Sequence, residues 1–81
     1  MEIRNIVILY NDSEVTKEQI TADLKGEGYT HNFMFANPIT KESTLERHLH
    51  TIDEVWLFKD CSHMWQYKFF TDKGCDIWQM S

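Results

Sequence analysis

The chain has 81 residues, which is the size of one small domain, and its net charge of −5 argues against nucleic acid or an anionic membrane as a partner. Two cysteines are too few for a disulfide scaffold, no basic and apolar leader opens the chain, and no apolar run approaches the length of a membrane span. We therefore expect a single cytoplasmic domain over residues 1–81.

The first quarter of the chain predicts a strand followed by a helix. Residues 3–10 contain a continuous apolar run of strand length, and the turn formers at 11–13 end it. Thr16 and Gln19 have the spacing of a capping box, and Gly28 stands where a helix would end.

The next segment repeats the pattern. Residues 30–36 predict a short strand with two phenylalanines on one side and Met34 on the other, and the Asn37-Pro38 pair stops it. Ser43 and Glu46 form a second capping box. The helix that follows should bury one stripe of apolar side chains, made of Leu45, Leu49 and Ile52.

The rest of the predicted fold is organised around residues 55–58, a run of apolar residues. Four consecutive apolar residues rich in β-formers predict a central parallel strand that is covered on both faces. Ser62 should cap a third helix over residues 63–73, and residues 75–80 should form the final strand.

The predicted order is β-α-β-α-β-α-β. Regular alternation with short connections indicates a mainly parallel sheet with right-handed crossovers. The sequence therefore predicts an α/β fold, a small three-layer α/β/α sandwich with a four-stranded sheet, which is a single Rossmann-like domain.

Polar residues follow three of the predicted strands and should meet at the carboxyl edge of the sheet, where ligands bind in such folds. The alternative for all of them is ordinary turn and capping chemistry. The candidate ligand-binding residues are Asn11, Asp12, Ser13, Asn37, Asp60 and Ser62.

Nucleophilic and metal chemistry have weaker signals. Cys61 stands near a predicted helix N-terminus, which would lower the pKa of its thiol, but the sequence shows no positioned base. The four histidines and two cysteines lack the spacing of a metal site. We expect no metal, no cofactor and no catalytic residue.

Several short motifs carry a resemblance to a known family. They are Glu27-Gly28-Tyr29, Asn37-Pro38, the segment Ile52 to Phe58, and a Ser-x-Met turn before a helix. From Glu27 onward the chain resembles the small nucleoside 2-deoxyribosyltransferase-like proteins of the SLOG type. The resemblance implies a Rossmann-like fold and sugar contacts from Asp60 and Ser62.

One departure from that family concerns catalysis. Where the family's enzymes carry a nucleophilic glutamate, this chain has Tyr67, and His63 replaces the glycine of the turn. Three hypotheses follow. The first is non-catalytic binding of a nucleotide-like or nucleoside-like ligand. The second is a small interaction or inhibitor protein, of phage or mobile-element type, that acts through exposed aromatic residues. The third is an N-glycosidic-bond enzyme with a relocated nucleophile.

The third predicted helix is apolar on more than one side, which predicts association. We expect a homodimer or a protein complex through Trp65 and Phe69, joined by Trp78 of the final strand. The alternative is that the rings fold inward and leave Gln66 and Lys73 in contact with water.

Overall fold

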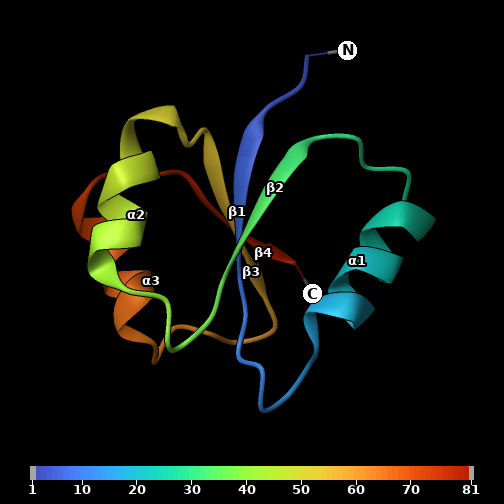
Figure 1. The fold of residues 1–81 in the computed structure, drawn as a ribbon, viewed down its shortest axis with the longest axis horizontal. Coiled ribbons are helices and arrows are strands. Elements are labelled where there is room, and N and C mark those ends of the chain that lie inside the picture. Colours follow the sequence, from blue (N-terminus) through green and yellow to red (C-terminus); the bar gives the residue numbers. More distant parts are fainter. Residues whose placement is uncertain (1, 81) are drawn as a thin grey trace.

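A four-stranded, all-parallel sheet forms the middle layer of the computed structural model, which describes residues 2–80 (Figure 1). Strands and helices alternate along the chain, so the predicted α/β fold is confirmed. The strands are β1 (Asn5–Leu9), β2 (Asn32–Ala36), β3 (Glu54–Phe58) and β4 (Ile77–Met80). The helices are α1 (Lys17–Gly26), α2 (Glu42–His48) with a 3₁₀ turn over Leu49–Thr51, and α3 (Trp65–Asp72).

Helix α1 begins and ends as its sequence predicts. The side chain of Thr16 accepts a bond from the Gln19 N–H at 3.2 Å, and the Gln19 side chain accepts one from the Thr16 N–H at 2.8 Å. At the other end, Gly28 has a φ of +79°, and the Tyr29 N–H donates to the Leu24 carbonyl at 3.1 Å. Gly28 is thus the left-handed residue of a Schellman motif, where glycine costs least.

The predicted caps of the other two helices are wrong. Helix α2 begins after Lys41, so Ser43 lies inside it, and α3 begins after Met64 rather than after Ser62; neither cap makes a side-chain hydrogen bond. Ser62 lies instead in the preceding turn, where its N–H and its hydroxyl both donate to the Asp60 carboxylate. Helix α3 starts only after this turn is complete.

The strand order in the sheet is β2-β1-β3-β4, so β1 and β3 are the two interior strands, as predicted for β3. Figure 1 shows α1 on one face of the sheet and α2 and α3 together on the other. Among the described residues, no helix is long and apolar enough to cross a membrane.

Two apolar cores lie on the two faces. On the α2 and α3 side, the alternate strand residues Val7, Leu9, Val55 and Leu57 pack against Leu45, Phe69 and Phe70. On the α1 side, Ile6 and Ile8 pack against Ile20 and Leu24. Phe33 and Phe35 join the α1 side and Met34 the opposite side, which confirms the predicted alternation of β2.

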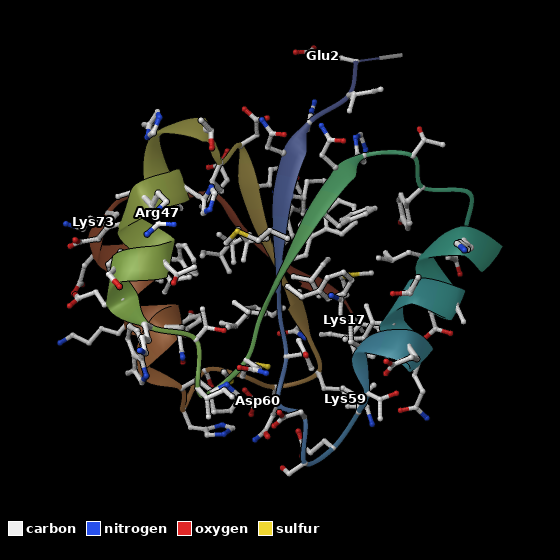
Figure 2. All side chains as sticks on the ribbon, viewed as in Figure 1. Glu2, Lys17, Arg47, Lys59, Asp60 and Lys73 are labelled. Carbon is white, nitrogen blue, oxygen red and sulfur yellow. The ribbon has the colours of Figure 1, made fainter. Side chains whose placement is uncertain are left out.

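The connections after β1, β2 and β3 leave the sheet at one end, its carboxyl edge (Figure 1). Lys59 and Asp60 lie at this end, and Glu2 lies at the opposite end (Figure 2). Lys59 has a φ of +67°, a left-handed conformation that costs a non-glycine residue about 1–2 kcal/mol. The turn after β3 is therefore tight enough to hold a lysine in an unfavourable conformation.

Leu57→Ala should destabilise the domain by about 2–5 kcal/mol, because Leu57 is 5% exposed in the core of an interior strand. Equilibrium urea denaturation measures the change. Ile39→Ala is the control, since Ile39 is 82% exposed and should shift the midpoint little. A Leu57→Ala midpoint equal to that of wild type would contradict the central role of β3.

Candidate binding site

Two turns at the carboxyl edge have the same internal hydrogen bonds. The Asn11 Oδ1 accepts bonds from the Ser13 N–H at 3.1 Å and from its hydroxyl at 2.8 Å. The Asp60 Oδ1 accepts the equivalent pair from Ser62 at 3.1 and 2.7 Å. These bonds hold the pKa of the Asp60 carboxyl below its usual value, and the Ser62 hydroxyl contributes most.

The turn after β2 repeats this chemistry and connects to the turn after β1. The Asn37 Oδ1 accepts bonds from the Ile39 N–H at 3.1 Å and from the Thr40 hydroxyl at 3.2 Å. The Asn37 side-chain N–H donates to the Asp12 carboxylate at 3.3 Å. All six predicted ligand-binding residues thus lie in loops at one edge, and Asn11, Asn37 and Asp60 each close their own turn.

Cys61 lies between the carboxyl ends of β1 and β3. The connections after these two strands lead to opposite sides of the sheet, and doubly wound folds bind their ligands at such a point. The Cys61 side chain is fully buried, with Sγ 3.5 Å from the Leu9 carbonyl oxygen and 3.4 Å from that of Phe58. Burial raises the pKa of the Cys61 thiol, with a further contribution from nearby Glu14. The predicted lowering of this pKa is therefore wrong, and Cys61 is a structural residue.

Gln66 on α3 holds the loop between β2 and α2 in place. It is fully buried, and its side-chain N–H₂ donates to the carbonyls of Asn37 at 2.9 Å and Thr40 at 3.3 Å. The prediction that Gln66 stays in contact with water if the rings fold inward is wrong. The sequence could not indicate that Gln66 binds this loop, because its partners are backbone carbonyls 26 and 29 residues away.

The three predicted interface residues do not form one surface. Trp65 and Trp78 are 46% and 57% exposed, whereas Phe69 is 8% exposed and belongs to the core under α3. Trp65 lies on α3, and Trp78 pairs with Trp56 on the opposite, α1 side of the sheet. The two exposed tryptophans therefore face different directions.

The α1 face contains an open groove of about 910 Å³, which the sequence reasoning missed. Helix α1 covers only part of this face, and beyond it Trp56, Phe58 and Met80 are half-buried and Trp78 is exposed. The floor is made of Trp56, Phe58, Trp78 and Met80, and one wall is formed by Ala22, Asp23 and Gly26 of α1 together with Glu27 at the C-cap of this helix. One helix is too narrow to cover a face of four strands, so a single helix on this face would have indicated such a groove.

Trp56 is the centre of an aromatic cluster at one end of this groove. Its ring lies 5.1 Å from Tyr29, 5.6 Å from Phe33 and 6.1 Å from His31, measured between centroids, with the rings tilted or edge-on. Such pairs add about 0.5–1.5 kcal/mol each beyond the area that they bury. Trp56, at the centre of the floor, is therefore fixed in place by its neighbours.

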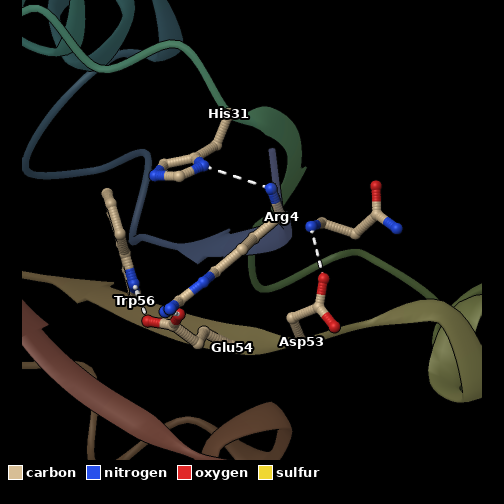
Figure 3. Close-up of polar contacts among 6 residues, drawn as sticks. Arg4, His31, Asp53, Glu54 and Trp56 are labelled. Carbon is tan, nitrogen blue, oxygen red and sulfur yellow. Dashed lines mark hydrogen bonds and ion pairs between the residues drawn. The ribbon is translucent and has the colours of Figure 1, made fainter. Parts of the chain in front are cut away.

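Glu54 holds the polar edge of the same cluster (Figure 3). It is buried, accepts a bond from the Trp56 indole N–H at 3.1 Å, and forms an ion pair with Arg4. These contacts, and the indole bond above all, lower the pKa of the Glu54 carboxyl. The Arg4 N–H donates to His31 Nδ1 at 3.2 Å, which links the pair to the cluster.

The remaining charges of the groove are acidic. Arg4–Glu54 is the one ion pair among residues 2–80, and the exposed carboxylates of Asp23 and Glu27 stand on the α1 wall. Within the same residues, no group of three histidine, cysteine, aspartate or glutamate side chains could hold a metal ion. The groove thus combines an aromatic floor with an acidic wall.

Comparison of the chain with protein-family models, curated proteins and solved structures found no match. The resemblance to deoxyribosyltransferase-like proteins therefore rests on its short motifs alone.

Glu54→Gln should lower stability at neutral pH, with the loss shrinking in acid. Because the folded-state pKa of Glu54 lies below its ordinary value of 4.5, the charged form stabilises the fold above that pH. This contribution disappears as the pH falls through the folded-state pKa. Urea midpoints between pH 7 and pH 3 should converge for wild type and variant. A constant difference would contradict the prediction, and Glu46→Gln on α2 controls for the loss of one charge.

Asp60→Asn tests the carboxyl edge as a small-ligand site. If a nucleoside or nucleotide binds there, the variant should bind it about tenfold or more weakly, because hydrogen bonds to a charged group contribute about 1.5–3 kcal/mol. Calorimetric titration with adenosine, thymidine and AMP measures the affinity, and Asp72→Asn on α3 is the control. Equal affinity for wild type and Asp60→Asn would remove Asp60 from the site.

Proposed function

We propose that this domain is a non-enzymatic binding module that takes a segment of a partner protein into the groove beside α1. This is the interaction-protein hypothesis, moved to a different surface. The observation that carries it is the part of the α1 face that α1 leaves open, floored by Trp56, Phe58, Trp78 and Met80. Interface hot spots are enriched in tryptophan and tyrosine that lie in well-packed pockets.

The preformed cluster around Trp56 supports the proposal. Binding is penalised when side chains must be ordered at the interface, by about 0.5–1.5 kcal/mol for each flexible one. Here Trp56 is already fixed by three neighbouring rings and by Glu54. Trp78, more than half exposed on the edge strand, supplies additional apolar area next to this fixed centre.

The two rival hypotheses have less geometric support. At the carboxyl edge, Cys61 fills the space beside β1, and Asn11, Asn37 and Asp60 each close a turn. Binding of a nucleotide-like ligand there stays a prediction. The enzyme hypothesis needs a nucleophile elsewhere, because the position that the resemblance gives to it is Tyr67, a half-buried ring that packs against the core.

Trp78→Glu should weaken partner binding about tenfold or more, because it places a charge in the apolar floor. Peptides selected on the wild-type domain from a displayed random library supply the ligands, and their affinities are measured for each variant. Trp65→Glu is the matched control, since it makes the same exchange at an exposed tryptophan on the opposite side. Selected peptides that bind Trp78→Glu as tightly as wild type would contradict the proposal.

A further inference from the structure

The groove has features that specify its occupant. We infer that it binds an amphipathic α-helix with lysine or arginine along one flank, lying beside α1 across β3 and β4. This inference rests on the proposed function and names the class of partner. The apolar face of the helix meets Trp56 and Trp78, and its basic flank faces Asp23 and Glu27.

The dimensions of the open face match one helix. Parallel strands lie about 4.8 Å apart and a helix with its side chains is about 10 Å wide, so one helix covers about two strands. Three helices are divided two and one between the faces of this four-stranded sheet, and the open part of the α1 face is floored by β3 and β4. A five-residue strand is about 17 Å long, which corresponds to about 11 residues of helix.

The α1 wall allows a second helix to approach closely. Ala22 and Gly26 are one turn apart and both line the groove. A Cβ atom built on Gly26 meets nothing within 4 Å, so no contact inside the domain requires glycine there. Small side chains on facing helices shorten the distance between the helix axes toward the lower end of the usual 8–10 Å range.

The acidic side chains of the groove favour a partner helix with basic residues on one flank. Asp23 on α1 and Glu27 at its C-cap are four residues apart and both line the groove, and Arg4 is already paired with Glu54. Two carboxylates at this spacing suit two basic side chains one turn apart on a neighbouring helix. The same charges repel an acidic peptide or a phosphate group.

A second copy of this chain fits the groove poorly. Helices α1 and α2 bury their large apolar residues against their own sheet, as Leu24 and Leu45 show, and α3 leaves Trp65 as a single exposed ring, so none of them has a continuous apolar stripe free for another chain. A copy would therefore present the polar side of a helix, and it would bring a second net charge of −5 to an acidic wall.

The tryptophan indole signals report the site directly, because the chain has three tryptophans. Trp56 and Trp78 lie in the groove, and Trp65 lies on α3, on the other side of the sheet. The probe is a helix-stapled peptide of about 14 residues with leucines at i, i+3, i+4 and i+7 and lysines on one flank. In ¹H–¹⁵N spectra of the full chain, it should shift the Trp56 and Trp78 indole signals and leave that of Trp65 unchanged.

Two comparisons test the charge preference. The same peptide with glutamate in place of lysine should bind at least tenfold more weakly. The double variant Asp23→Asn, Glu27→Gln should bind the lysine peptide about fivefold more weakly, as expected for two exposed ion pairs. Its control, Glu42→Gln with Glu46→Gln, removes the same two charges at the same spacing from exposed positions of α2 and should leave the affinity unchanged.

Different results would contradict different parts of the inference. Equal binding of the lysine and glutamate peptides at Trp56 and Trp78 would overturn the basic flank while leaving the groove as a binding site. No shift at either tryptophan up to millimolar peptide would overturn the helical occupant, and so would a dimer formed by the domain alone through Trp78. The proposed function falls separately, if library-selected peptides bind Trp78→Glu as well as wild type.

Discussion

The handedness of crossovers between parallel strands determines which face each helix covers. Such connections are right-handed in nearly all proteins, so the direction of the step along the sheet decides the face. From β1 the chain steps outward to β2, and it then crosses back over β1 to reach β3 and continues to β4. The single step in one direction places α1 alone on its face, and the two steps in the other direction place α2 and α3 together.

This division makes the two faces chemically different. The face under α2 and α3 is closed by aliphatic and aromatic side chains and has Cys61 and Gln66 at its edge. The face under α1 changes from aliphatic residues on β1 to half-buried aromatic residues on β3. Glu54 is tolerated on this second face because Trp56 and Arg4 satisfy its carboxylate, which would be costly to bury without partners.

Local sequence patterns predicted the fold well, and they predicted the surfaces poorly. The apolar runs of β1 and β3 and the capping box at Thr16 involve neighbours in sequence, so they can be recognised without the structure. Ser62 misled because turns and helix caps use the same side chains, and the cap expected at Ser43 failed because α2 begins two residues earlier, after Lys41. The groove could not be recognised locally, since it depends on which face each helix covers and joins α1 to strands encoded far along the chain.

The all-parallel pairing also affects how the domain is made. Strand β1 pairs with β2 on one side and with β3 on the other, and its β3 side is encoded much later, as the 2.8 Å bond from the Asn5 N–H to the Asp53 carboxylate, 48 residues apart, illustrates. Sheets assembled from such distant segments fold slowly, and the chain emerges from the ribosome amino terminus first. Until β3 and the helices around it arrive, Val7 and Leu9 have no core to enter. An apolar strand in that state is prone to pair with other chains, so the stability of β1 depends on the arrival of segments that follow it by more than 40 residues.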